Sequence, residues 1–296
     1  MKHPSKITNI VMDFDGTCTQ IPLIYEAFLA QYLVGLNTTV LAQAPIMKAE
    51  WWEAQQEVRK HSPTAPWTIK TAPASPAAAD PYILAYECAQ HVLRKKQIKA
   101  DIPLSVFQNA ASNNMAPWRN EARSVFDTLL KHGIHISFIS NTDSATIYER
   151  LKALFAVETI EQLPKGISVM SGASKYAIAE LLWDSSIPHQ AQEAFGKVPA
   201  VHADMGIYRP VYLRRGYYFE AISAALGHNM DRLLSTVFCG DIWEMDLAMP
   251  HALGANIHLI ERAAPFDTYP YERNAVLAAK GRGKIGKDLT SLLEWI

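Results

Sequence analysis

Residues 7–17 read ITNIVMDFDGT, a short apolar segment that runs directly into two aspartates, a glycine and a threonine. The segment from Ile7 to Met12 is rich in β-forming residues and apolar on both faces, which is typical of a parallel strand buried on both sides. The aspartates follow at the point where the strand must end. The stretch therefore predicts a central buried strand with Asp13 and Asp15 at its carboxyl end.

Two later strands are predicted to end in residues of the same kind. A strand over 134–139 is followed by Ser140 and Asn141, and a strand over 236–239 is followed by Gly240-Asp241, with Asp246 five residues beyond Asp241. Reactive groups in open parallel sheets gather beyond the carboxyl ends of the strands. The sequence therefore predicts one site built from three strand ends.

The residue types at these strand ends indicate phosphate chemistry with a divalent cation. Clustered aspartates repel one another unless some are protonated or a cation binds, and Mg²⁺ is commonly held by one or two carboxylates together with phosphate. One aspartate can attack phosphorus, and a second, two residues further along an extended segment, projects to the same side as a general acid and base. Ser140 and Asn141 can donate to a phosphoryl oxygen, and a cationic side chain is still required.

Regular alternation of helices and strands is predicted for most of the chain. Helices are expected at 23–36, 46–60, 82–96, 118–131, 144–155, 175–183, 217–226, 243–253 and 288–295, and further strands at 167–170 and 256–260. Between 20 and 115 only helices are expected, with 61–81, which contains five prolines, as an irregular loop. The pattern predicts an α/β protein with a doubly wound parallel sheet and an inserted helical block.

The motifs at the strand ends resemble those of the haloacid dehalogenase-like superfamily. Asp13-x-Asp15-Gly16-Thr17 is similar to its first motif, Ser140-Asn141 to its second, and Gly240-Asp241-x-x-x-x-Asp246, with 252–255 reading ALGA, to its fourth. The resemblance implies a Rossmann-like core over 1–19 and 116–296 and a mobile helical cap over 20–115. It also implies an insertion around 185–210.

The resemblance further implies a role for each motif residue. Asp13 is expected to be the nucleophile and Asp15 the general acid and base. Asp13, the backbone carbonyl of Asp15 and Asp241 are expected to hold Mg²⁺, with Asp246 as a further ligand or as a group that orients one. Thr17, Ser140 and Asn141 are expected to contact phosphate. The dehalogenases of the superfamily lack the second aspartate, so Asp15 favours phosphoryl transfer.

The cation of the third motif has four candidates in this chain. The superfamily places a lysine or arginine before the helix that precedes the fourth-motif strand, and Arg214 and Arg215 stand before the expected helix at 217–226. Arg209-Pro210 resembles the superfamily's Lys-Pro pair but lies further upstream, and Lys175 lies on a different expected helix. Arg214 is the preferred candidate.

Composition limits the partners and the compartment. The chain has 296 residues, 28 basic against 29 acidic side chains and a formal net charge of −1, which gives no general attraction to nucleic acid or anionic membranes. Three scattered cysteines favour a reducing compartment, and neither a secretory signal nor a membrane-spanning run is recognisable. A cytoplasmic protein is expected, and the sequence leaves its oligomeric state open.

The sequence thus predicts a Mg²⁺-dependent phosphatase of a small phosphorylated metabolite that acts through an aspartyl-phosphate. A phosphomutase would use the same two aspartates and is the enzymatic alternative. A catalytically silent binding protein that retains the acidic pocket is the alternative from another class. No basic cluster in the helical block identifies the metabolite.

Overall fold

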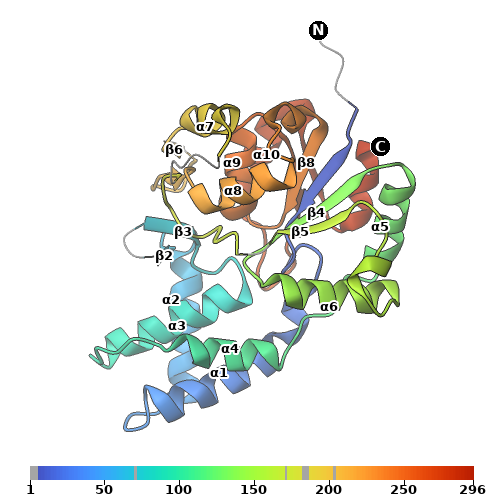
Figure 1. The fold of residues 1–296 in the computed structure, drawn as a ribbon. Coiled ribbons are helices and arrows are strands. Elements are labelled where there is room, and N and C mark those ends of the chain that lie inside the picture. The colour runs from blue at the N-terminus through green and yellow to red at the C-terminus, as the bar shows by residue number, and fades with distance from the viewer. Residues whose placement is uncertain (1–5, 70–71, 171, 182–186, 203–204) are drawn as a thin grey trace.

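The computed structural model describes residues 6–69, 72–170, 172–181, 187–202 and 205–296. Six strands form one sheet in the order β10-β9-β8-β1-β4-β5, and every neighbouring pair is parallel (Figure 1). The strands are β1 (Asn9–Met12), β4 (His135–Ile139), β5 (Ile167–Met170), β8 (Thr236–Gly240), β9 (Asn256–Ile260) and β10 (Gly283–Gly286). The predicted doubly wound parallel sheet is confirmed, with β10 as an edge strand that the sequence pattern did not reveal.

Alternate residues of β1 face two separate hydrophobic layers, as the two-residue period of a strand requires. Ile10 and Met12 pack into a cluster with α5 (Ala122–Lys131), α6 (Ser144–Phe155) and the 3-10 helix Leu289–Trp295. Val11 faces the other cluster, which contains α7 (His189–Gly196), α8 (Gly216–Ala225), α9 (Ala248–Ala252) and α10 (Pro270–Ala278). Both faces of the sheet are therefore covered, which explains why β1 reads as a continuous apolar run.

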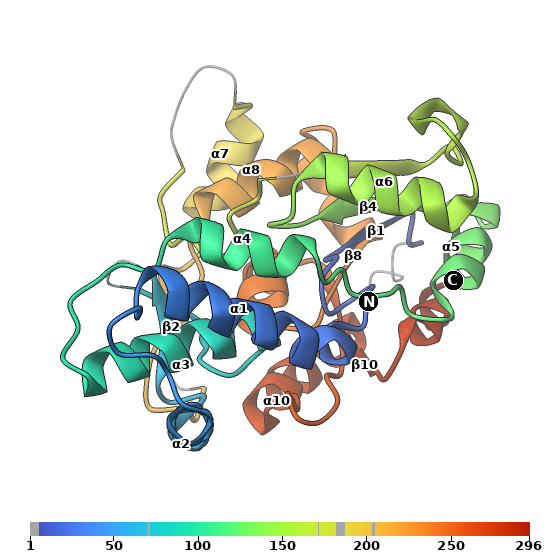
Figure 2. The ribbon, with the colours of Figure 1, turned by 90° about the horizontal axis from the view of Figure 1, so that it is seen from below.

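A helical block follows β1 and has a hydrophobic cluster of its own. It contains the 3-10 helix Ile21–Ile24, α1 (Tyr25–Thr39), α2 (Lys48–His61), α3 (Pro81–Lys95) and α4 (Leu104–Ser112). Helix α1 packs on α4, and α2 packs on α3, around buried side chains such as Phe28, Leu36 and Leu84 (Figure 2). Asp80 caps α3, since its side chain accepts a hydrogen bond from the Ile83 amide at 2.7 Å.

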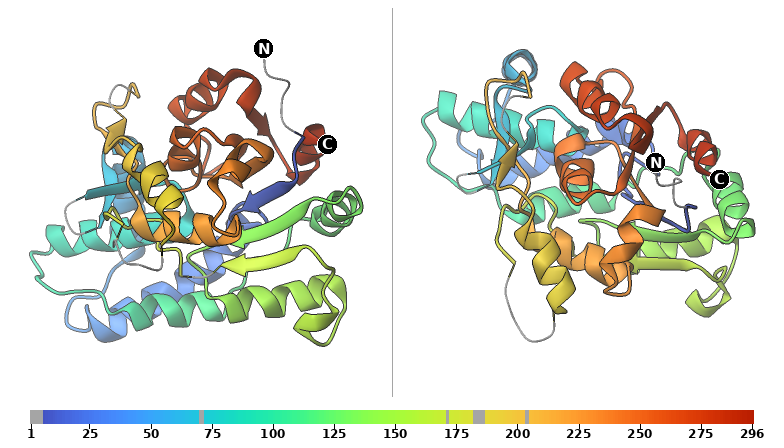
Figure 3. Two further views of the ribbon diagram at one scale, coloured as in Figure 1. Left: turned by 45° about the horizontal axis from the view of Figure 1, so that its top comes forward. Right: turned by 90° about the horizontal axis from the view of Figure 1, so that it is seen from above.

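The segments that enter and leave the helical block run side by side. Thr19 forms an antiparallel bridge with Trp118, the Gln20 amide donates to the Pro117 carbonyl at 2.8 Å, and the Arg119 amide donates to the Cys18 carbonyl at 2.9 Å. The block lies beyond the carboxyl ends of the strands, because the arrowheads of β1, β4 and β5 point toward it (Figure 3).

The segment 61–81 is not a plain irregular loop, and the expectation of no strand in the block is wrong. It contains the antiparallel strands β2 (Pro66–Ile69) and β3 (Ala72–Pro76), which form a hairpin; residues 70–71 lie outside the described ranges. The prolines hide the sequence pattern of a strand, because proline has no backbone N–H to donate to a neighbouring strand. A two-stranded ribbon has two outer edges, and its register shifts between Trp67 and Thr68, so it accommodates prolines that a central strand would reject.

The expected helix at 175–183 is also wrong over its described part. Residues 175–176 form a turn, residues 177–181 are not helical, and Ala179 forms a parallel bridge with Arg215; residues 182–183 lie outside the described ranges. Pairing with a distant segment has overridden the local helical pattern. The expected helix at 243–253 begins as a π-helix, Trp243–Leu247, before α9. In the described part of the chain, no helix is both long and apolar enough to cross a membrane.

Candidate active site

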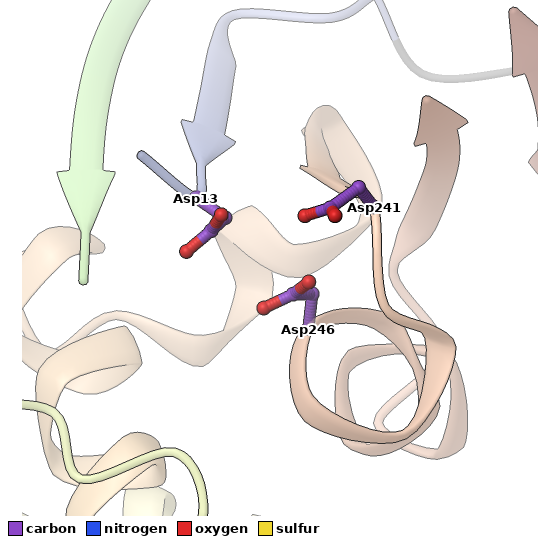
Figure 4. Close-up of side chains that lie close together, drawn as sticks. All are labelled: Asp13, Asp241 and Asp246. Carbon is purple, nitrogen blue, oxygen red and sulfur yellow. The ribbon is translucent and has the colours of Figure 1, made fainter. Parts of the chain in front are cut away.

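Three aspartates converge at the carboxyl edge of the sheet. Asp13 follows β1, Asp241 follows β8, and Asp246 lies in the π-helix Trp243–Leu247. One carboxylate oxygen from each lies within 4.8 Å of the other two, and the three side chains point toward one another (Figure 4). Asp241 and Asp246 are buried, whereas the Asp13 side chain is 10% exposed. Asp13 is therefore the member of the cluster that a ligand can reach.

Two glycines and a threonine allow these carboxylates to approach. Gly16 has a φ of +85°, and a Cβ there would lie 2.7 Å from Asp241 Oδ2. A Cβ on Gly240 would lie 2.2 Å from the Cβ of Asp246, so neither glycine can be replaced without moving an aspartate. The hydroxyl of Thr17 is 2.9 Å from Asp13 Oδ2 and 3.0 Å from Asp241 Oδ1, which joins the ends of β1 and β8.

A buried lysine supplies positive charge to the cluster. The ammonium group of Lys175 donates to Asp13 Oδ1 and to Asp246 Oδ1, the latter at 2.7 Å, and its side chain is 1% exposed. Lys175 follows β5 by five residues, and its backbone amide donates to Asn141 Oδ1 at 2.8 Å. The loop after β4 thus holds the lysine that follows the neighbouring strand.

The electrostatics of the cluster are those of a site with too much negative charge. Burial is the main cause that raises the pKa of Asp13 to about 7, although Lys175 opposes the shift. Burial and the neighbouring charge of Asp246 raise the pKa of Asp241 well above its ordinary value. Three carboxylates face one ammonium group, so a hard divalent cation with oxygen ligands fits the donor set.

Both carboxylate oxygens of Asp246 accept hydrogen bonds within the protein. Its Oδ1 accepts from Lys175, and its Oδ2 accepts from the Ile242 amide at 2.9 Å. Asp241 accepts from Thr17 through Oδ1, and its Oδ2 lies against Gly16. These contacts agree with either role expected for Asp246, as a further ligand or as a group that orients one.

Asp15 is positioned by the loop after β4. Its Oδ2 accepts a hydrogen bond from Thr142 Oγ1 at 2.5 Å. Burial raises its pKa, and the hydrogen bond from Thr142 and the charge of Arg150 oppose the shift in part. A carboxyl group whose pKa is raised by burial is suited to general acid catalysis. The hydroxyl of Ser140 accepts from the Thr142 amide at 3.0 Å, so Ser140 stabilises the loop that carries Thr142.

The three arginine candidates have other partners. Arg214 pairs with Glu180 at 2.9 Å and lies over the ring of Phe195. Arg209 forms a bidentate ion pair with Glu244 at 2.6 and 2.9 Å, and Arg215 donates to backbone carbonyls. The preference for Arg214 is therefore corrected: its side chain turns to Glu180, and Lys175 is the candidate that contacts the aspartates.

Three residues with no role expected from the sequence pattern touch the aspartate cluster or the residues that support it. Thr142 donates to Asp15, Tyr218 donates to the Asp246 carbonyl at 2.8 Å, and Arg262 donates to the Asp241 carbonyl. Thr142 and Arg262 follow β4 and β9 within three residues, so their closeness to a strand end could have predicted a place at the site. Tyr218 lies on α8, and nothing local distinguishes it from a core tyrosine.

No protein-family model matches this sequence, and no curated protein matches it. Solved structures do match. YfnB from Bacillus subtilis, described as a HAD-hydrolase bound to magnesium, superposes with a TM-score of 0.51 at 12% identity over 98% of each chain. A predicted phosphoglycolate phosphatase from Haemophilus somnus has a TM-score of 0.49 at 12% identity, over 98% of each chain. A structure described as a β-phosphoglucomutase from Thermotoga maritima also has 0.49, at 11% identity, over 98% of this chain and all of that one.

At this level of identity the likeness concerns the fold. The six-stranded parallel sheet, the helical block inserted after β1 and the aspartates at the strand ends agree with the motifs recognised in the sequence. The chain therefore has the fold of the haloacid dehalogenase-like (HAD) hydrolases.

Proposed function

We propose that this protein is a Mg²⁺-dependent phosphatase that hydrolyses a small phosphorylated metabolite through an aspartyl-phosphate on Asp13. The observation that carries the proposal is the pairing of a partly accessible Asp13 with the buried ammonium group of Lys175. A cation at this position can neutralise charge on a phosphoryl group while it transfers to Asp13. Asp241 and Asp246 complete an oxygen donor set that suits Mg²⁺.

The chain's own residues account for both halves of the reaction. The Asp13 carboxylate attacks phosphorus, the ester P–O bond breaks, and Asp15 gives its proton to the leaving oxygen. Asp15 then takes a proton from the water that attacks the aspartyl-phosphate, which releases inorganic phosphate and restores Asp13. Mg²⁺ held by Asp13, the Asp15 carbonyl and Asp241 would neutralise phosphoryl charge. Ser140 supports the loop that carries Thr142, the donor to Asp15. Asn141 accepts from the backbone of Lys175, and Thr17 bonds to Asp13.

Asp15 favours phosphoryl transfer over dehalogenation. A haloacid releases halide, which needs no proton, whereas an alkoxide leaving group does. Burial raises the pKa of Asp15, which favours a carboxyl group that keeps a proton, whereas the hydrogen bond from Thr142 orients the group and opposes that shift in part.

The proposal includes a division into a core of 1–19 and 116–296 and a cap of 20–115. Ala79 and Ile83 of the helical block form an apolar cluster with Ile242 and Met245, which lie within the fourth motif. Trp67 of the hairpin packs on Tyr176, next to Lys175, with 5.7 Å between the ring centroids. These contacts support a cap that covers the site and selects the substrate.

The test is release of inorganic phosphate from a panel of phosphorylated metabolites by the purified protein with Mg²⁺. Asp13→Asn should lower turnover by several orders of magnitude and abolish the phosphorylated adduct in mass spectra. Asp143→Asn is the matched control, because Asp143 is exposed and caps α6 through the Thr146 amide at 2.8 Å. Substantial turnover by folded Asp13→Asn would refute the assignment. Transfer of the phosphoryl group back to the sugar, giving a bisphosphorylated sugar without release of phosphate, would indicate a mutase. No turnover of any substrate would indicate a binding protein.

A further inference from the structure

Arg215 lies between Lys175 and the helical block and is fully buried. It stands immediately before α8, where Ala179 bridges to it in parallel and the Gly216 amide donates to the Ala179 carbonyl at 2.8 Å. A Cβ on Gly216 would lie 2.6 Å from the Glu180 carbonyl oxygen, so glycine is required for this close approach. The pairing therefore fixes Arg215 against the extended segment that follows Lys175.

The guanidinium of Arg215 donates to backbone carbonyls on two sides. Its Nη1 donates to the carbonyl of Lys175, its Nη2 donates to the carbonyl of Ala74 at 2.8 Å, and its Nε is 3.4 Å from the carbonyl of Tyr212. Ala74 belongs to β3 of the hairpin in the helical block and is itself fully buried. One planar group thus joins the peptide of the candidate cation to the peptide of the proposed cap.

These carbonyls matter because the charge of Arg215 has no carboxylate pair among the described residues. Burial is the main cause that lowers the pKa of Arg215 to about 10. A buried charged donor that loses a hydrogen-bond partner pays the full cost of its desolvation. Withdrawal of the hairpin would therefore leave the Nη2 group unpaired and would favour a rearrangement of Arg215.

The peptide of Lys175 is held at both ends. Its N–H donates to Asn141 Oδ1 at 2.8 Å, and its carbonyl accepts from Arg215. Movement of the Arg215 guanidinium would break the second of these two hydrogen bonds. The ammonium group would then lose part of the constraint that places it against Asp13.

We propose, resting on the function proposed above, that Arg215 is a positioning residue that couples the seating of the β2–β3 hairpin to the orientation of Lys175. With the hairpin seated, both carbonyls are bridged and Lys175 is held against Asp13. With the hairpin displaced, Lys175 is less constrained. The cation would thus be correctly placed when the cap covers the site.

Other contacts between the block and the core provide a way to loosen the cap from a distance. Arg59 of α2 donates to the carbonyl of Pro265, and its guanidinium lies 4.9 Å from the centre of the Phe266 ring. Neither of these contacts involves Lys175 or Arg215. Arg59→Met therefore weakens the contact between the helical block and the core without changing a contact of Lys175 or Arg215.

The experiment is a double-mutant cycle of Arg59→Met and Arg215→Met in the full chain, read by hydrogen exchange. With Arg215 present, Arg59→Met should speed exchange in the hairpin and, about fivefold, in the segment 172–181. In the Arg215→Met background, Arg59→Met should still speed exchange in the hairpin but should leave 172–181 unchanged. Two results would overturn the coupling. In the first, Arg59→Met speeds exchange in the hairpin but leaves 172–181 unchanged in both backgrounds. In the second, it speeds exchange in 172–181 by the same factor with and without Arg215.

Kinetics provide a second readout with para-nitrophenyl phosphate as the probe. Arg215→Met should lower kcat about tenfold with little change in KM, because Lys175 acts on the transferring group rather than on binding. Arg215→Lys keeps the charge but cannot bridge two carbonyls with a planar fork, so it should restore folding without restoring kcat. Full activity in Arg215→Lys would contradict the positioning role. Hydrogen exchange needs no turnover, so failure of the proposed function would not be mistaken for failure of the coupling.

Discussion

Replacing Lys175 by methionine removes the ammonium group from the aspartate cluster and keeps an unbranched side chain of similar length. In the native structure, the group donates to Asp13 and Asp246 and is 1% exposed. After the change, two buried carboxylates face each other with no cation between them. Both stability and catalysis should respond, and the two effects have separate physical causes.

The loss of stability follows from the uncompensated charge. Breaking a buried ion pair by removing one partner typically costs about 3–5 kcal/mol. For a chain of this size, such a loss lowers the thermal midpoint on the order of 10 °C in the absence of divalent ions. Mg²⁺ would compensate the same carboxylates, so it should raise the midpoint of Lys175→Met more than that of the wild type.

The loss of activity follows from the missing charge at the transferring phosphoryl group. Removing one preorganised donor of this kind typically costs a factor of about 10²–10³ in kcat. Arg214→Met is the comparison, because Arg214 pairs with Glu180, whose side chain is 64% exposed. A pair whose carboxylate is exposed contributes about 0–1 kcal/mol, so this variant should remain active and should lose less stability than Lys175→Met.

The assay combines calorimetry, with chelator and with Mg²⁺, and initial rates on para-nitrophenyl phosphate at saturating Mg²⁺. Near-normal kcat in Lys175→Met together with a hundredfold loss in Arg214→Met would refute the assignment of the cation. An unchanged thermal midpoint in chelator would refute the charge argument, whatever the rates.

Three further predictions concern the metal, Asp15 and a buried histidine. Chelator should abolish turnover and Mg²⁺ should restore it, whereas Ca²⁺, which prefers more ligands and looser geometry, should support it poorly; chelator-resistant turnover would contradict a metal site at the aspartates. Thr142→Val should lower kcat about tenfold and Thr142→Ser should not, because a hydroxyl donor orients Asp15; equal rates in both would show that the hydrogen bond has no catalytic role. Burial lowers the pKa of His258 to about 3, so below pH 6.5 the folded chain binds fewer protons than the unfolded chain and its stability falls as the pH falls. Between pH 7 and pH 5, the free energy of unfolding measured with denaturant should fall by about 2 kcal/mol more in the wild type than in His258→Gln.

The central part of the sheet and the aspartates were predictable because their signals are local. The apolar runs of β1, β4 and β8 end where the chain meets polar residues, and the shared direction of the strands brings those ends together. The register confirms this in detail: Met12 pairs with Phe138 on one side and with Cys239 on the other. Asp13, Ser140 and Asp241 therefore start from nearly the same level of the sheet.

The hairpin and the partners of the arginines were not predictable in the same way. The hairpin pairs proline-rich segments that carry no strand pattern, and it is held by contacts with β7 (Val211–Tyr212) and with Arg215, more than a hundred residues away. Arg209, Arg214 and Arg215 lie within seven residues of one another, yet they bond to Glu244, to Glu180 and to two backbone carbonyls. Their spacing in the sequence contains no information about these partners, because each partner comes from a different element.

Lys175 is an instructive intermediate case, because the rule that located the aspartates also applies to it. A strand at 167–170 was predicted, and residues that follow a strand at the carboxyl edge are candidates for the site. The pattern of 175–183 predicted a helix there, which left the arginines before α8 as the preferred candidates. In the structure, Lys175 lies in a turn after β5, held by Asn141 and Arg215, and its side chain reaches the cluster from the fourth strand end. Position relative to the sheet is therefore a better guide to the cation in this fold than distance from a helix, since the ends of parallel strands meet at one edge whatever the lengths of the insertions between them.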